Sequence, residues 1–121
     1  MRVLIGVTSC EKFAERRKAQ LETWIVEAWL TPRFLPELEI RFFVGTEGAG
    51  VKDPDPLCHY LQCGDRYEDQ IAKTEALVEF ALKHGFDFLF KCDDDTYVRV
   101  DRLLASGFEK HDWNVPTYFK C

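Results

Sequence analysis

Residues 86–95 read FDFLFKCDDD, an apolar and aromatic run that leads directly into three aspartates, Asp93, Asp94 and Asp95. The run from Phe86 to Cys92 is short, rich in aromatic residues and preceded by the turn signal His84-Gly85, which predicts a buried strand. A strand that ends in three carboxylates concentrates negative charge at one edge of a sheet. This stretch therefore predicts a strand whose last residues form a polar site.

Carboxylate oxygens at a strand end are suitable ligands for a hard divalent cation such as Mg²⁺ or Mn²⁺, which then holds substrate phosphates. The open end of an α/β sheet is also where such folds bind their ligands. The alternative is a solvated acidic turn in which one aspartate caps the following helix. The residues by themselves leave both interpretations open.

The composition indicates one globular domain over residues 1–121, because this length provides a single core. The 46% hydrophobic and 31% charged content is ordinary for a soluble protein. The net charge of -5 argues against nucleic-acid binding. No apolar stretch approaches the roughly 20 residues that span a bilayer, and no signal peptide precedes the first predicted strand, so we expect a soluble chain without a membrane segment.

The cysteines predict neither a zinc site nor a redox motif, since no C-x-x-C pair is present and an odd number leaves at least one thiol unpaired. The spacing of Cys58, His59 and Cys63 fits no common zinc site. We expect reduced, mostly buried thiols. The five cysteines are Cys10, Cys58, Cys63, Cys92 and Cys121.

Strands and helices alternate along the chain, which predicts an α/β fold with a mainly parallel sheet. We expect strands over residues 2–8, 40–44, 59–62, 86–92 and 115–119. Ser9 is expected to cap a helix that carries an apolar stripe. A capping box at 65–68 opens a second helix that runs to Lys83, and a third covers 100–110. The expected buried positions are Leu21, Trp24, Ile25 and Ala28 in the first helix and Ile71, Thr74, Leu77, Val78 and Ala81 in the second.

Several short segments, taken in order, carry a family pattern. They are Thr8-Ser9, Arg16-Arg17-Lys18-Ala19 with Thr23-Trp24, Phe42-Phe43-Val44-Gly45, Asp65-Arg66-Tyr67 with Lys73-Thr74, and Lys91-Cys92-Asp93-Asp94-Asp95-Thr96-Tyr97-Val98. In this combination the chain resembles the beta-1,3-galactosyltransferase and fringe-like glycosyltransferases over nearly its whole length. The acidic motif in register with the Lys-Thr helix is the specific part, and each other segment alone is weak.

The resemblance implies a GT-A-like, Rossmann-type sandwich that corresponds to the N-terminal, donor-binding half of such an enzyme. It implies transfer of a hexose, of the galactose or N-acetylglucosamine type, from a UDP-sugar to a glycan or protein hydroxyl with inversion. The implied cofactor is Mn²⁺ (or Mg²⁺). A cation at the acidic motif is chemically reasonable, because the departing UDP gains negative charge in the transition state.

The resemblance also assigns roles to individual residues. Asp95 is implied to be the principal metal ligand, with Asp93 as a second one. Asp93 and Asp94 are implied to orient the ribose, the donor sugar or metal-bound water. The other implied nucleotide contacts are Thr8, Ser9, Arg17 and Lys73.

The chain departs from the family pattern at Leu21, where the family has a second arginine, and at Asp69, where it has an asparagine. The family's Glu-Asp-Val segment, which carries the general base, lies beyond the acidic motif. No residue after Asp101 fits that role, although His111 and Asp112 are available by type. Inverting transfer needs such a base. We therefore leave the catalytic residue unknown and expect donor binding rather than complete catalysis from this chain alone.

Three other functions are compatible with parts of this pattern. A non-catalytic UDP or nucleotide-sugar binding module agrees with the missing base. A phosphohydrolase with a nucleophilic aspartate is disfavoured by Tyr97 and by a first strand that ends in Thr-Ser. A receiver domain needs an acidic pair after the first strand, where Ser9-Cys10 is followed by the single Glu11.

Two further expectations concern the setting of the chain. A truncated sheet exposes an apolar edge, which favours a homo-dimer. The compartment is left open: the Golgi lumen if the chain follows the eukaryotic family, and the cytoplasm if it is microbial or viral.

Overall fold

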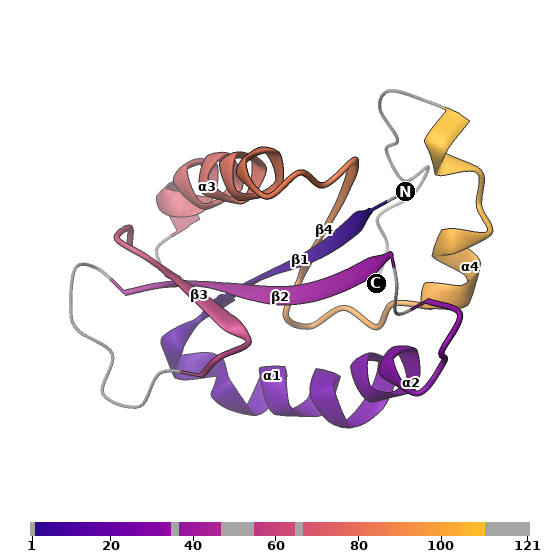
Figure 1. The fold of residues 1–121 in the computed structure, drawn as a ribbon. Coiled ribbons are helices and arrows are strands. Elements are labelled where there is room, and N and C mark those ends of the chain that lie inside the picture. The colour runs from indigo at the N-terminus through magenta and orange to yellow at the C-terminus, as the bar shows by residue number, and fades with distance from the viewer. Residues whose placement is uncertain (1, 35–36, 47–54, 65–66, 111–121) are drawn as a thin grey trace.

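The computed structural model describes residues 2–34, 37–46, 55–64 and 67–110, and its centre is a four-stranded parallel sheet (Figure 1). The strand order is β3-β2-β1-β4. The strands are β1 (Val3–Cys10), β2 (Leu38–Gly45), β3 (Cys58–Leu61) and β4 (Phe88–Asp93). The prediction of an α/β fold with a mainly parallel sheet is confirmed, because every strand pair in the described part of the chain is parallel.

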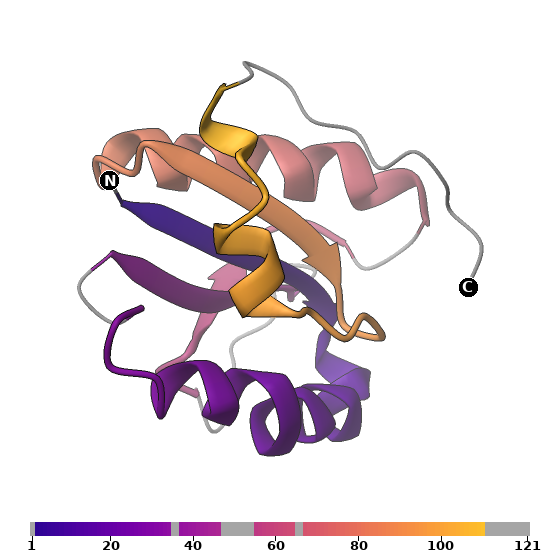
Figure 2. The same cartoon turned by 90° about the vertical axis from the view of Figure 1, so that its right-hand side faces the viewer.

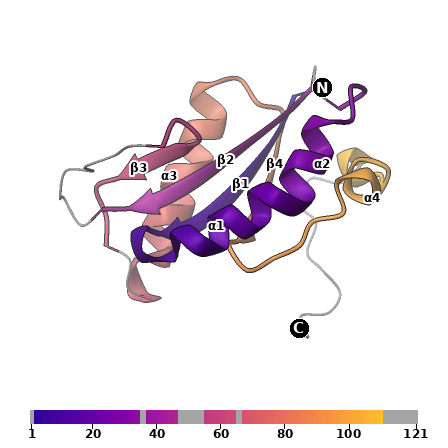
Figure 3. The same cartoon turned by 90° about the horizontal axis from the view of Figure 1, so that it is seen from below.

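Helices cover both faces of this sheet (Figures 1 and 3). One face carries α1 (Ala14–Gln20), a π-helical turn (Leu21–Ile25) and α2 (Val26–Trp29), and the opposite face carries α3 (Gln70–Lys83). The short α4 (Val100–Leu104) lies across one end of the sandwich (Figure 2). Three 3-10 turns complete the described elements: Glu11–Phe13, Tyr67–Asp69 and Phe108–Lys110.

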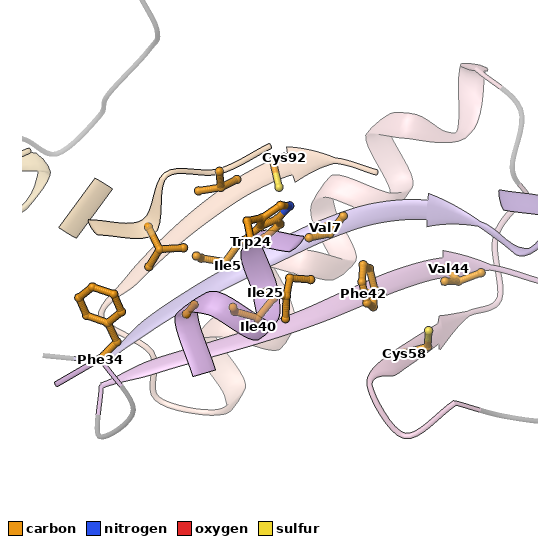
Figure 4. Packing of buried hydrophobic residues seen from close by; sticks show 13 residues of the cluster. Ile5, Val7, Trp24, Ile25, Phe34, Ile40, Phe42, Val44, Cys58 and Cys92 are labelled. Carbon is orange, nitrogen blue, oxygen red and sulfur yellow. The ribbon is translucent and has the colours of Figure 1, made fainter. Parts of the chain in front are cut away.

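Two hydrophobic clusters lie on the two faces of the sheet. The larger one packs Trp24 and Ile25 of the first helical segment against Ile5 and Val7 of β1 (Figure 4). The smaller one packs α3 against the opposite side of β1 and its neighbours. It consists of Leu4, Phe43, Leu61, Leu77 and Ala81. Because β1 is buried on both faces, its near-continuous apolar sequence is that of a central parallel strand.

The buried side of α3 differs from the predicted one. Ile71 and Val78 are exposed, by 74% and 42%, so placing them in the core was wrong. The prediction is confirmed at Leu77 and Ala81, and Lys73 completes this buried row, whose members are spaced four apart on one helix face. The cause is a close approach to β1: a Cβ atom at Gly6 would lie 2.4 Å from Leu77 Cδ1. Gly6 therefore admits Leu77 and sets the rotation of the helix.

Other differences are local. Ser9 continues β1 and makes no capping bond, because the helical segment begins only with the 3-10 turn at Glu11. Strand β4 lies at the edge of the described sheet and is only partly buried. The predicted helix 100–110 ends at Leu104, and Gly107, with φ of 80°, separates it from the last 3-10 turn. The apolar stripe of the first helix is confirmed at Trp24, Ile25 and Ala28.

Several predictions fall on residues that the structure does not describe: Asp65-Arg66 of the capping box, His111, Asp112, the strand 115–119 and Cys121. The four described cysteines are not joined to one another by disulfide bonds, and Cys58 and Cys92 are buried. None of the helices in the described ranges is long and apolar enough to cross a membrane. The expected homo-dimer stays a prediction.

Candidate functional site

The candidate site lies where β1 and β4 end. Their register pairs Thr8 with Asp93, so the acidic turn that follows β4 lies beside the last residues of β1. Parallel strands end at the same edge of the sheet, which is the usual position for ligands in α/β folds. A cleft of about 620 Å³ opens at this edge. Its polar lining includes Thr8, Ser9, Arg16, Glu68, Gln70, Lys73, Lys91, Asp93, Asp94 and Asp95.

Asp94 is the buried member of the three aspartates, with only 7% of its surface exposed. The Ser9 hydroxyl donates to Asp94 Oδ2 at 2.8 Å, and Arg16 Nη1 lies 3.3 Å from Oδ1. Arg17 Nη1 donates to Ser9 Oγ at 3.0 Å, which directs the serine proton toward the aspartate. Both carboxylate oxygens are thus occupied, so Asp94 holds the turn in place in this conformation.

Asp93 and Asp95 are exposed and line the cleft. The Thr8 hydroxyl donates to Asp93 Oδ1 at 3.0 Å, and Lys91 Nζ lies 3.8 Å from the same oxygen. The Asp95 carboxylate has no hydrogen bond or ion pair with another residue in the described ranges. Within the acidic turn, Asp93 and Asp95 are therefore the carboxylates that are exposed in the cleft.

Lys73 is brought to the site by the rotation of α3. Its side chain is 1% exposed and its Nζ donates to the Ser9 carbonyl oxygen at 3.0 Å. Leu77, one helical turn later, packs into the space above Gly6, and this contact places Lys73 over the end of β1. Burying an ammonium group is costly unless it is paired. Lys73 is therefore part of the site rather than a solvated helix lysine.

The two neighbouring arginines have different positions. Arg16 lines the cleft, and its guanidinium stacks on the Phe13 ring with its Cζ atom 3.7 Å from the ring centroid. Arg17 is absent from the described lining and instead donates to Ser9 Oγ and to the Cys10 carbonyl oxygen. The guanidinium that faces the cleft thus belongs to Arg16, while Arg17 braces the end of β1.

Two further residues, missed in the sequence, hold the acidic turn from the helical layer. Gln20 Nε2 donates to the carbonyl oxygens of Asp93 and Thr96, at 3.2 and 2.8 Å. Trp24 Nε1 donates to the Thr96 carbonyl oxygen at 3.1 Å. A signal was present in the sequence, because Gln20 precedes the core residue Trp24 by four positions and so shares its helix face.

The exposed carboxylate oxygens of the acidic turn are suitable ligands for a hard divalent cation. Asp93, Asp94 and Asp95 contribute carboxylate oxygens to the lining of the cleft, and such oxygens are the ligands that this kind of cation prefers. Burial, and then the charge of Asp93, raises the pKa of the neighbouring Cys92 thiol to about 12. Within the described part of the chain no three His, Cys, Asp or Glu side chains form a ready-made metal cage. A cation that bridges to substrate phosphates needs only one or two carboxylates and keeps several waters. Asp93 and Asp95 could supply these carboxylates.

Fold and cleft together define a Rossmann-like α/β domain with a polar cleft at the carboxyl edge of its sheet. The chain is 32% identical over 111 residues to beta-1,3-galactosyltransferase 6 of Mus musculus, which covers 82% of this chain and 33% of that protein. It is 30% identical over 113 residues to hydroxyproline O-galactosyltransferase GALT2 of Arabidopsis thaliana, covering 85% of this chain and 16% of the relative. For the Arabidopsis GALT6 enzyme of the same description the identity is 29%, covering 87% and 16%.

These similarities confirm the resemblance to galactosyltransferases that the motifs predicted. The chain spans one third or less of the length of each of these relatives. No family model matches the sequence, and no solved structure matches it.

Proposed function

We propose that this chain forms the donor-binding part of a galactosyltransferase-type glycosyltransferase that uses a UDP-sugar. The whole enzyme would transfer the hexose to a hydroxyl of a glycan or glycoprotein with inversion. The observation that carries this proposal is the convergence of Asp93, Asp95, Arg16 and Lys73 on one cleft, in a chain similar to galactosyltransferases over more than four fifths of its length.

In the proposed site, Asp93 and Asp95 hold Mn²⁺ or Mg²⁺. When bound, that cation supplies charge neutralisation for the diphosphate leaving group. Arg16 faces the same cleft and offers a planar donor pair suited to a phosphate group. Lys73 adds a fixed positive charge at the end of β1, where Ser9 and Thr8 also lie. The Asp94 carboxylate contacts Ser9 and Arg16, and these contacts hold the turn that carries the two exposed aspartates.

The transfer itself forms a bond between the acceptor oxygen and the anomeric carbon while the bond from that carbon to the diphosphate oxygen breaks. The electron pair of the broken bond leaves with UDP. The acceptor proton passes to a general base, which the sequence does not assign. The residues described above would thus serve the leaving-group side of the reaction.

The test is a calorimetric titration of UDP into the folded chain, first with Mn²⁺ and then with excess chelator. We expect binding that requires the metal and that is lost in Asp95→Asn. The matched control is Asp101→Asn, which makes the same chemical change at an exposed acid outside the cleft. No binding by a folded wild-type chain would remove the proposal and return the aspartates to a solvated turn.

The second candidate is a UDP or nucleotide-sugar binding module without transfer. The described lining of the same cleft favours this candidate. Apart from Glu68, its carboxylates all belong to the acidic turn, and the proposed site already uses them to hold the cation and the turn. Metal-dependent UDP binding together with no release of hexose from UDP-galactose, in the presence of glycan or peptide acceptors, identifies this candidate. Transfer to any acceptor excludes it.

A further inference from the structure

A buried glutamine contacts both ends of the acidic turn. Gln20, at the end of α1, is 5% exposed, and its amide Nε2 donates to the carbonyl oxygens of Asp93 and Thr96. Only the NH₂ group of an amide side chain can donate to a carbonyl, so these contacts fix the orientation of the amide. One side chain therefore ties the turn 93–96 to the helical layer below the sheet.

The same two carbonyl groups take part in two other hydrogen bonds. The Thr96 N–H donates to the Asp93 carbonyl oxygen at 3.2 Å, which closes the turn. Trp24 Nε1 donates to the Thr96 carbonyl oxygen. Each carbonyl thus accepts two hydrogen bonds, which uses both of its lone pairs. The backbone on either side of Asp94 and Asp95 is therefore held at both ends.

The other atom of the Gln20 amide makes no such contribution. Oε1 is buried and has no hydrogen-bond partner among the residues that the structure describes. A buried acceptor left unpaired is unfavourable, and an apolar side chain of the same size would avoid it. What such a side chain cannot supply is the pair of bonds from Nε2 to the turn.

We propose that Gln20 is a positioning residue for the divalent cation and UDP. By holding the Asp93 and Thr96 carbonyl groups, it fixes the turn in the conformation in which Asp93 and Asp95 face the cleft. Gln20 is not among the residues that line the cleft, so it acts through the turn and not on the ligand. This inference rests on the proposed function for the identity of its ligands.

Gln20→Leu separates positioning from folding. Each turn carbonyl keeps one hydrogen bond in this variant, from Thr96 N–H or Trp24 Nε1, and the unpaired Oε1 is removed. We therefore expect a Tm close to that of the wild type. The Kd for UDP in the presence of Mn²⁺ should rise about tenfold or more, as is typical for residues that orient metal ligands. The matched control, Gln62→Leu, makes the same change at an exposed glutamine and should leave the Kd unchanged.

A second readout does not depend on nucleotide binding. Amide hydrogen exchange of residues 93–98, followed without metal or UDP, should be faster in Gln20→Leu, while exchange in β1 stays the same. A merely structural role predicts the opposite pair of results: a lower Tm with an unchanged Kd for the folded fraction. That outcome overturns the proposal, as does a Kd within twofold of the wild-type value.

The two proposals fail in different ways. If the folded wild-type chain binds no UDP, the proposed function fails, and the exchange experiment alone decides the role of Gln20. Faster exchange of the turn at an unchanged Tm then supports positioning, and unchanged exchange refutes it. If Gln20→Leu does not fold, Gln20→Met fills the same space with a more flexible apolar chain and is measured by the same two readouts.

Discussion

The two faces of the sheet differ in how many hydrophobic residues they bury, although both contribute side chains to the cleft or to its support. Among the residues that the structure describes, the face covered by α1 and α2 buries thirteen in one cluster, whereas the face covered by α3 buries five. The larger face holds the acidic turn through Gln20 and Trp24, and the smaller face supplies Lys73. We infer that the geometry of the aspartates depends on the better-packed face, whereas the position of Lys73 depends on the packing of α3, in which Leu77 lies close to Gly6.

The largest effect is expected from Trp24→Ala on the larger face. Trp24 is 1% exposed, so its removal should lower the free energy of unfolding by about 3–5 kcal/mol. It also removes the indole bond to the Thr96 carbonyl oxygen. Urea denaturation followed by circular dichroism measures the change. Trp29→Ala, at a partly exposed tryptophan of the same helical segment, should cost about 1 kcal/mol or less. Equal losses in the two variants would contradict the assignment of Trp24 to the core.

A smaller effect is expected from Gly6→Ala on the opposite face. The new Cβ atom would lie 2.4 Å from Leu77 Cδ1, so either the Leu77 side chain or α3 must shift, and overpacking of this kind costs about 1–3 kcal/mol. The shift should also lengthen the bond between Lys73 Nζ and the Ser9 carbonyl oxygen and weaken UDP binding. Leu77→Val in the Gly6→Ala background relieves the overlap. A double-mutant cycle should therefore give a coupling of about 0.5 kcal/mol or more, and additive effects would argue against the contact.

These two faces were not equally predictable from the sequence. The stripe of Trp24, Ile25 and Ala28 was predictable because its spacing follows one helix face. The exposed Val26, Trp29 and Leu30 lie off that face. In α3 the aliphatic residues occur on both sides, and which side is buried depends on Gly6, far away in the chain. The sequence therefore favoured Ile71 and Val78 over Lys73, and a tertiary contact decided otherwise.

The candidate site shows the same division. The acidic turn and its position at a strand end were predictable, because apolar periodicity and charge change abruptly at Asp93. The distinct roles of the three aspartates were not, since they depend on side chains from β1 and α1. The sequence also could not indicate which of the two arginines, Arg16 or Arg17, faces the cleft. Adjacent helical residues point about 100° apart, and the 3-10 turn at Glu11–Phe13 sets which of them faces the cleft.

A third substitution tests the rotation of α3 directly. Leu82 is 74% exposed and Leu77 is fully buried, although both are leucines of the same helix. Leu82→Ser should change the free energy of unfolding by no more than about 0.5 kcal/mol. Leu77→Ser should be far more destabilising, because it creates a cavity and buries a hydroxyl group. A large loss at Leu82 and a small one at Leu77 would show that the opposite side of the helix faces the sheet.

The smallest effect is expected at acidic pH, from a histidine at the rim of the smaller face. His59 packs against Phe43 and Phe80, with ring centroids 5.5 and 5.0 Å apart. Partial burial, and then the charges of Arg41, His84 and Lys83, lower the pKa of His59 below its ordinary value of 6.5. The unfolded chain therefore binds this proton more readily than the folded chain as the pH falls below 6.5.

Stability that depends on neutral His59 is consequently present above about pH 6.5 and is lost as the pH falls toward the lower folded value. We expect the urea midpoint of the wild type to fall more steeply between pH 7 and pH 5 than that of His59→Asn, whose side chain does not titrate. The difference should be small because the imidazole is largely exposed, and salt should reduce the part that Arg41 and Lys83 contribute. Parallel pH profiles for the two proteins would mean that protonation of His59 does not change the stability of the face covered by α3. The difference between the two faces would then be one of packing alone.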